Sequence, residues 1–119
     1  MKDLDLTQLP SQAGRTILIT GDIGLGRELV KCLAALGPAK IFFSGRNQAR
    51  ADEILADLNH RYPDVQAKFV QMDLASLSDI QRAVQSVILQ FDNRLDVLVC
   101  NAGIMATPPG LIPDGYEIQ

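Results

Sequence analysis

The sequence has few of the residues that disulfide-linked and zinc-binding proteins require. Among its 119 residues there are two cysteines, one histidine and no tryptophan. Cys32 and Cys100 cannot form a disulfide framework, and together with the single histidine, His60, they do not make up a zinc site. We therefore expect no metal ligands and a reducing compartment, of which the cytoplasm is the simplest choice.

The sequence also lacks an excess of positive charge and a long apolar stretch. It has 11 Lys and Arg residues against 14 Asp and Glu residues, which gives a net charge of −3. Because proteins that bind the phosphate backbone of nucleic acid are basic, nucleic acid is not an expected partner. No apolar run approaches the ~20 residues of a membrane span. Residues 1–6 have no apolar signal-peptide core.

Four short apolar segments alternate with three amphipathic ones. The apolar segments are typical of buried strands and cover residues 16–20, 41–43, 66–72 and 95–100. Between them, apolar residues recur at helical spacing over residues 25–36, 51–58 and 77–91. Strands that are apolar throughout, with helices between them, predict an α/β fold whose parallel sheet is covered by helices on both faces.

The chain length limits this sheet to about four strands. Right-handed crossovers give a Rossmann-type sheet the order 3-2-1-4, and the third segment is less apolar, as suits an edge strand. Each strand–helix unit uses about 26 residues, so a six-stranded sheet needs roughly 50 residues more than the chain has. We expect a polar N-terminal segment over residues 1–14 and a partial Rossmann domain over residues 15–119.

A glycine-rich turn joins the first apolar segment to the helix that follows it. Gly21, Gly24 and Gly26 allow the backbone to approach a pyrophosphate group, and the start of the helix offers free N–H groups. On its own, such a turn is equally a tight connection between a strand and a helix. It also occurs in other Rossmann-type classes, such as methyltransferases, so the assignment depends on further motifs.

Two motifs carry a resemblance to a known family. The segment Thr20-Gly21-Asp22-Ile23-Gly24-Leu25-Gly26 resembles the Thr-Gly-x-x-x-Gly-x-Gly segment of the short-chain dehydrogenase/reductase family, with one residue fewer between its first two glycines. Cys100-Asn101-Ala102-Gly103 resembles the Asn-Asn-Ala-Gly motif that follows the fourth strand in that family. Residues 103–105 and 114–117 resemble its retinol-dehydrogenase-like branch. The resemblance runs from about residue 14 to residue 119 and covers the N-terminal half of a family member.

The resemblance implies a nicotinamide dinucleotide site at the carboxyl ends of the strands. The pyrophosphate would lie on the glycine turn, the adenine beside the third strand and the riboses near the fourth. The implied cofactor-binding residues are Thr20, Gly21, Gly24, Leu25, Gly26, Asp73, Leu74, Asn101, Ala102 and Gly103. Two of them have simpler explanations, because Asp73 could cap a helix and Asn101 could be a turn residue.

Arg46 indicates which dinucleotide binds. It lies 20 residues after Gly26, where an acidic residue would bind a free ribose 2′-hydroxyl and an arginine can neutralise a 2′-phosphate. We therefore predict NADP rather than NAD, the alternative being a solvated arginine at the start of the second helix. Asp22 brings a negative charge close to the same place, which opposes a phosphate.

These features predict an NADP-dependent oxidoreductase that transfers a hydride between nicotinamide and an alcohol or carbonyl carbon. In the family a tyrosine, a lysine four residues later and a serine catalyse the reaction, and none of them can be assigned here. We therefore expect only the cofactor-binding half, inactive as 119 residues. The alternatives are a truncated nucleotide-binding module without catalysis and a degenerate fragment. A small hydrophobic alcohol or carbonyl substrate is expected only for a longer chain, and an exposed sheet edge predicts a homo-oligomer.

Overall fold

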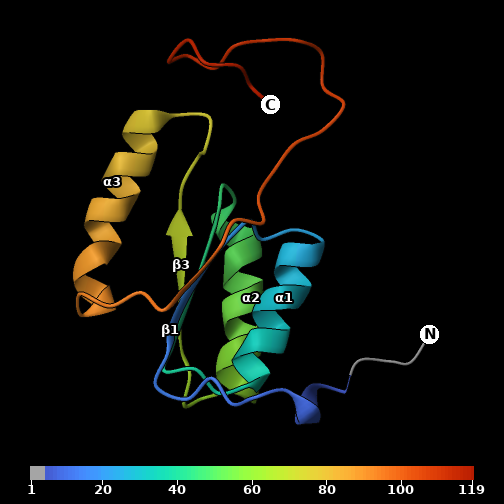
Figure 1. Ribbon diagram of the computed structural model, residues 1–119, viewed down its shortest axis with the longest axis vertical. Coiled ribbons are helices and arrows are strands. Elements are labelled where there is room, and N and C mark those ends of the chain that lie inside the picture. Colours follow the sequence, from blue (N-terminus) through green and yellow to red (C-terminus); the bar gives the residue numbers. More distant parts are fainter. Residues whose placement is uncertain (1–4) are drawn as a thin grey trace.

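The computed structural model describes residues 5–119, in which strands and helices alternate along the chain (Figure 1). A short 3₁₀ helix over Leu6–Gln8 precedes the first strand, and another over Leu89–Phe91 follows the last helix. The strands and α-helices are β1 (Thr16–Thr20), α1 (Leu25–Ala35), β2 (Lys40–Gly45), α2 (Gln48–Arg61), β3 (Gln66–Gln71), α3 (Leu77–Ile88) and β4 (Val97–Val99).

The strands form one parallel sheet in the order β3-β2-β1-β4, which confirms the predicted fold class and strand order. β1 pairs with β2 along its whole length, from Thr16 beside Lys40 to Thr20 beside Ser44. β3 lies at one edge, as its polar composition predicted. Parallel pairing places the carboxyl ends of all four strands at the same edge of the sheet. In Figure 1 this edge is the upper one.

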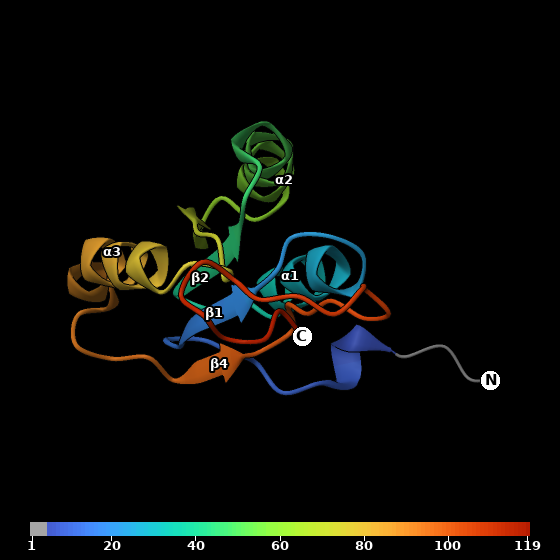
Figure 2. The same cartoon turned by 90° about the horizontal axis from the view of Figure 1, so that it is seen from above.

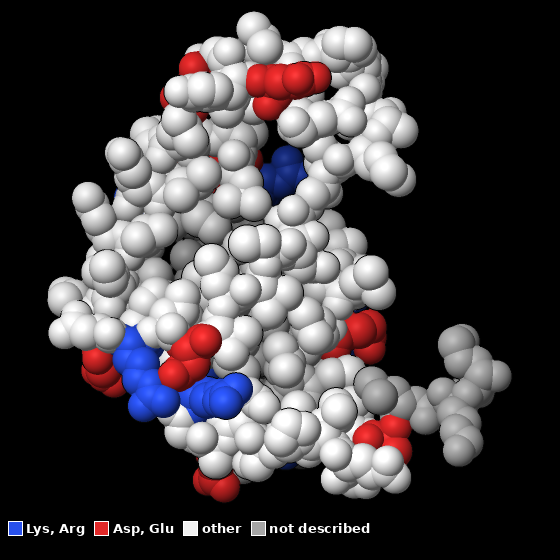
Figure 3. Space-filling view, in the orientation of Figure 1, with Lys and Arg blue, Asp and Glu red and all other residues white. Residues whose placement is uncertain are grey.

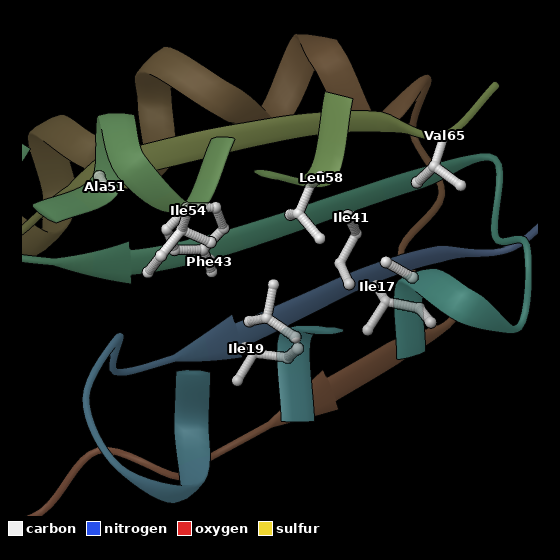
Figure 4. Packing of buried hydrophobic residues seen from close by; sticks show 10 residues of the cluster. Ile17, Ile19, Ile41, Phe43, Ala51, Ile54, Leu58 and Val65 are labelled. Atoms are coloured by element: carbon white, nitrogen blue, oxygen red, sulfur yellow. The ribbon is translucent and has the colours of Figure 1, made fainter. Parts of the chain in front are cut away.

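The helices cover both faces of the sheet. Figure 2 shows α1 and α2 on one side and α3 on the other. Because successive side chains of a strand point to opposite faces, Ile17, Ile19 and Phe43 pack beneath α1 and α2, together with Ile54 and Leu58 of α2 (Figure 4). No helix in the described residues is long and apolar enough to cross a bilayer.

The core under α3 is smaller. Phe42 and Val70 turn to this face and contact Ala83 and Val87 of α3. The Phe91 ring stands edge-on to the Phe42 ring, with 4.8 Å between their centres. These contacts hold α3 against β2 and β3. Within residues 5–119 no helix covers the same face over β4 (Figure 2).

Three sequence-based expectations need correction. The fourth strand is limited to Val97–Val99, because only these residues pair with β1, whereas residues 95–100 were expected. Leu25, which belongs to the apolar pattern of the first helix over residues 25–36, is 83% exposed, and Gly26, Val30 and Ala34 are the buried residues of this helix. On the third helix Leu77, Val84 and Ile88 are exposed as well. Helical periodicity predicted the helices correctly, but it did not show which of their apolar residues are buried against the sheet.

Candidate functional site

The candidate site lies at the upper edge of the sheet, where β1, β2 and β4 end. Four connections meet there: the glycine turn after β1, Arg46 and Asn47 after β2, residues 72–76 after β3 and residues 100–103 after β4. The segment that follows β4, red in Figure 1, passes above the same edge. The carboxyl edge of an open parallel sheet is where such folds bind ligands.

The start of α1 has no side-chain cap. Its N-cap residue is Gly24, which has φ 56° and offers no side chain for capping. Within the turn itself, the Gly26 N–H donates to the Ile23 carbonyl and the Glu28 N–H donates to the Gly24 carbonyl. An uncapped helix start keeps N–H groups and a positive dipole end available for a phosphate. The pyrophosphate contact at this turn stays a prediction.

Asn101 and Thr20 join the glycine turn to the end of β4. The Asn101 Nδ2 amide donates to the Thr20 carbonyl at 3.0 Å. The Thr20 hydroxyl donates to the Val99 carbonyl at 3.4 Å and accepts from the Ala102 N–H at 3.1 Å. These bonds hold Asn101 and Ala102 beside the glycine turn. The Asn101 side chain therefore connects two strand ends and is not simply a turn residue.

The same contact explains why glycine is needed at position 26. A Cβ atom there would lie 2.5 Å from Asn101 Nδ2 and 2.6 Å from the Gly21 carbonyl oxygen, both too close for any side chain. At Gly21, with φ 92°, a Cβ would lie 2.9 Å from the same Asn101 nitrogen. The structure thus brings together Thr20, Gly21, Gly26, Asn101 and Ala102 in one packed unit.

Arg46 follows β2 and borders a depression of about 570 Å³. The side chain of Arg46 is exposed, and its guanidinium forms no ion pair within residues 5–119. The start of α2 lies on the same depression, capped by the Asn47 side chain, which accepts from the Arg50 N–H. The remaining lining residues are Asp22, Ile23, Gln48 and Arg50.

Sequence reasoning missed Arg50. It stands in the first turn of α2, four residues after Arg46, and its guanidinium Nη1 is 3.7 Å from Asp22 Oδ1. A signal was present, because Arg50 is a second arginine four residues after Arg46. Arg50 brings a second guanidinium to this part of the edge, where the Asp22 carboxylate offsets its charge.

Asp73 and Leu74 follow β3, on the other side of Arg46. Asp73 does not cap α3, and the alternative explanation for this residue is therefore wrong: the cap is Ser76, whose hydroxyl accepts from the Asp79 N–H. The Asp73 carboxylate instead accepts from the Ala75 N–H, which closes a local turn. Leu74 is 44% exposed, so its apolar surface is available to a flat ligand such as adenine.

Asp79 supports this turn from α3. Its carboxylate accepts from the Asp73 N–H at 2.7 Å and pairs with the Arg82 guanidinium. The Asp73 N–H, and after it Arg82, lower the pKa of Asp79 below its ordinary value. A second depression, of about 330 Å³, opens here between Arg46, Gln71, Met72, Asp73, Asp79 and Arg82.

Six of the expected residues lie outside the packed unit: Gly24, Leu25, Arg46, Asp73, Leu74 and Gly103. Leu25 is 83% exposed, on the first turn of α1. Gly103 lies after β4 with open space around it, since an added Cβ would meet nothing within 4 Å. Both are exposed at the rim of this edge.

A parallel sheet in the order 3-2-1-4, with an uncapped glycine turn at its switch point, defines a Rossmann-type dinucleotide-binding fold. The profile of the family described as short chain dehydrogenase matches residues 15–114. The chain belongs to the short-chain dehydrogenase/reductase family, which confirms the resemblance seen in its motifs.

Curated relatives in fungi share this family. The chain is 38% identical over 112 residues to the short-chain dehydrogenase/reductase drtF of Aspergillus calidoustus, and this match covers 93% of the chain and 35% of drtF. It is 39% identical over 98 residues to the oxidoreductase fscI of Fusarium equiseti, covering 81% of the chain and 38% of fscI. The chain therefore spans little more than a third of the length of these relatives.

Solved structures show the same fold. An uncharacterized protein from Mycobacterium Paratuberculosis is 32% identical, with a TM-score of 0.75, over 98% of this chain and 40% of that protein. The L-sorbose reductase of Gluconobacter frateurii, solved with NADPH and L-sorbose, is 27% identical, with a TM-score of 0.72, over 87% of this chain and 37% of the reductase.

Proposed function

We propose that the chain is the cofactor-binding part of an NADP-dependent oxidoreductase. In this proposal the 119 residues hold the dinucleotide at the upper edge of the sheet. The cofactor supplies a hydride that is exchanged with an alcohol or carbonyl carbon. The observation that carries the choice of NADP is Arg46, an exposed guanidinium beside the start of α2 that forms no ion pair within residues 5–119.

Each part of the dinucleotide has its own place in this proposal. The uncapped start of α1 takes the pyrophosphate, and Leu74 and Asp73 take the adenine. Ala102 and Gly103, next to Asn101, lie under the riboses. Arg46 takes the 2′-phosphate, since a guanidinium matches a phosphate in charge and in geometry. The L-sorbose reductase neighbour was solved with NADPH, and a short chain dehydrogenase neighbour from Shigella flexneri was solved with NADP.

The substrate we propose is a small hydrophobic alcohol, aldehyde or ketone. This part rests on the resemblance of residues 103–105 and 114–117 to the retinol-dehydrogenase-like branch. The chain contributes no acid or base to the reaction in this proposal. Tyr62 has Gln66 and not a lysine four residues later, and Tyr116 comes soon after β4, earlier than the catalytic tyrosine of the family. We place the protein in the cytoplasm, in keeping with its two free cysteines, Cys32 and Cys100.

The test is the binding of NADP⁺ and NAD⁺ to the purified chain and to the variant Arg46→Ala, measured by calorimetry. We expect Arg46→Ala to weaken NADP⁺ binding by about tenfold or more, because it removes a charge-assisted contact with the phosphate. NAD⁺ binding should change by less than about threefold. Arg61→Ala is the matched control, since Arg61 is an exposed arginine at the opposite end of α2. Equal losses for the two cofactors would contradict the role of Arg46.

A further inference from the structure

Asp22 is a buried acid inside the glycine turn. It lies between Gly21 and Gly24 and is only 4% exposed. A Cβ atom on Gly45 would lie 2.5 Å from the Asp22 carboxyl carbon and 2.6 Å from each of its oxygens. The carboxylate is therefore packed against the backbone of Gly45 at the end of β2, next to Arg46.

Few interactions offset the cost of removing this carboxylate from water. Its Oδ2 atom is buried and has no hydrogen-bond partner among the described residues. Its Oδ1 atom is 3.7 Å from Arg50 Nη1, an ion-pair distance that is too long for a hydrogen bond. Buried charges in proteins are normally paired and hydrogen-bonded, because desolvation is costly. Asp22 is thus not explained by what it contributes to the fold.

The surroundings of Asp22 suggest a role in the site. It lines the same depression as Arg46 and Arg50, at the start of α2. Two guanidiniums and a helix start attract an anion, and in this chain the anion already present is the Asp22 carboxylate. A negative group that reaches Arg50 shares this arginine with the Asp22 carboxylate.

We propose that Asp22 limits how strongly the site prefers NADP over NAD, by opposing a 2′-phosphate bound at Arg46 in the depression that the two residues share. This inference rests on the proposed function. A ribose 2′-hydroxyl is a hydrogen-bond donor that tolerates a neighbouring carboxylate. A phosphate carries two negative charges and only acceptor oxygens at neutral pH, so the carboxylate repels it. Arg46 favours NADP, and Asp22 limits how strongly it is favoured.

The test compares Asp22→Asn with Asp64→Asn in the purified chain. Asparagine keeps the size of the side chain and removes its charge, and Asp64 is an exposed acid just before β3, at the opposite edge of the sheet. The probes are NADP⁺, NAD⁺, adenosine 2′,5′-bisphosphate and AMP, measured by calorimetry at low ionic strength, where charge effects are largest. Far-ultraviolet circular dichroism and thermal unfolding establish that each variant is folded.

We expect Asp22→Asn to bind NADP⁺ and adenosine 2′,5′-bisphosphate about tenfold more tightly than the unmodified chain does. Binding of NAD⁺ and AMP should change by less than about threefold, and the gain should shrink as salt is added. Asp64→Asn should change none of the four affinities by more than about twofold. Asp22→Ser, which removes the charge with a smaller side chain, should give the same preference if Asp22→Asn does not fold.

Three results would overturn the inference. An unchanged ratio of NADP⁺ to NAD⁺ affinity in both Asp22 variants would leave the proposed function intact and exclude Asp22 as its selector. Weaker NAD⁺ binding in both variants would show that Asp22 binds the ribose rather than opposing a phosphate. Folded chains that bind none of the four probes, with or without Asp22, would overturn the proposed function itself and this inference with it.

Discussion

At the scale of single residues, the site depends on the contact between the glycine turn and Asn101. The space that Gly26 leaves is filled by the Asn101 amide, which in turn donates to the Thr20 carbonyl. A methyl group at position 26 would meet a backbone oxygen, and a change of rotamer cannot move that oxygen away. Strain at this position must therefore be relieved by shifting the turn or β4.

We predict that Gly26→Ala lowers the free energy of unfolding by about 1–3 kcal/mol, as overpacking of a tight contact does. The same variant should lose dinucleotide binding, because the turn moves. Gly103→Ala is the matched control: an added Cβ there meets nothing within 4 Å, and we expect a change within about 0.5 kcal/mol. Urea unfolding of the two variants provides the measurement, and equal stabilities would contradict the packing described here.

The sequence predicted the site residues that belong to a motif. It did not predict the residues that reach the site only through packing of the folded chain. Arg46 and Asn101 stand at fixed distances from recognisable strand ends, and the structure places both at the carboxyl edge. Arg50 belongs to no motif and reaches the edge because α2 begins at Gln48. The burial of Asp22 depends on Gly45, 23 positions later in the chain. No local pattern reports such a contact, since it exists only once β1 and β2 are paired.

At the scale of the elements, α3 is the least fully packed helix. Its two fully buried residues, Ala83 and Val87, face Phe42 and Val70, while Val84, Ile88 and Leu77 on the adjacent side of the helix remain exposed. The apolar pattern over residues 77–91 therefore includes side chains that the sheet does not cover. Periodicity predicted the helix because it depends only on where the apolar residues stand in the sequence. How many of them are buried depends on which other elements pack against the helix.

We predict that Val87→Ala and Val84→Ala differ clearly in stability although they lie three residues apart. Val87 is 6% exposed, so its truncation should lower the free energy of unfolding by roughly 1–3 kcal/mol. Val84 is 43% exposed, and its truncation should change stability by about 0.5 kcal/mol or less. Both variants gain the same helix propensity, so the difference measures burial alone. Denaturant titration of the pair is the test, and similar losses would mean that α3 packs in another orientation.

The strands were predicted more accurately than the helix faces. The first strand was predicted at residues 16–20 and is observed there. A short, continuous apolar run between glycine turns is typical of a buried strand. The fourth was expected over residues 95–100 and pairs only over Val97–Val99. Its length is set by its partner β1, because a strand residue is defined by pairing and not by its own side chain.

At the scale of the whole molecule, the face over β4 carries little charge. Figure 3 shows a broad uncharged area across the middle of this face, with the visible charged side chains placed mostly around it. β4 is paired on one side only within residues 5–119, by β1. Leu98 in this strand is 54% exposed, and Leu95 just before it is 39% exposed. Unpaired strand edges with apolar side chains favour pairing with another copy of a chain.

We therefore predict that the purified chain sediments as a species heavier than its 13.0 kDa monomer, increasingly so at higher concentration. Leu98→Lys should shift this distribution to the monomer, because a charge on an edge strand opposes pairing. Asp64→Lys, a change to lysine on an exposed loop at the other end of the sheet, should not. Sedimentation velocity at several concentrations measures this, and a monomer at all of them would contradict the prediction.

The bond between Asn101 and Thr20 also has a consequence for how the protein is made. It joins residues 81 positions apart, so β1 leaves the ribosome long before the strand that completes its second side. At synthesis rates of about 5–20 residues per second, this interval lasts roughly 4 to 16 seconds. During this interval β1 keeps at least one open edge, and the glycine turn lacks its supporting amide. The carboxyl edge of the sheet is therefore complete only after β4 has been translated, and until then the open edge of β1 favours aggregation.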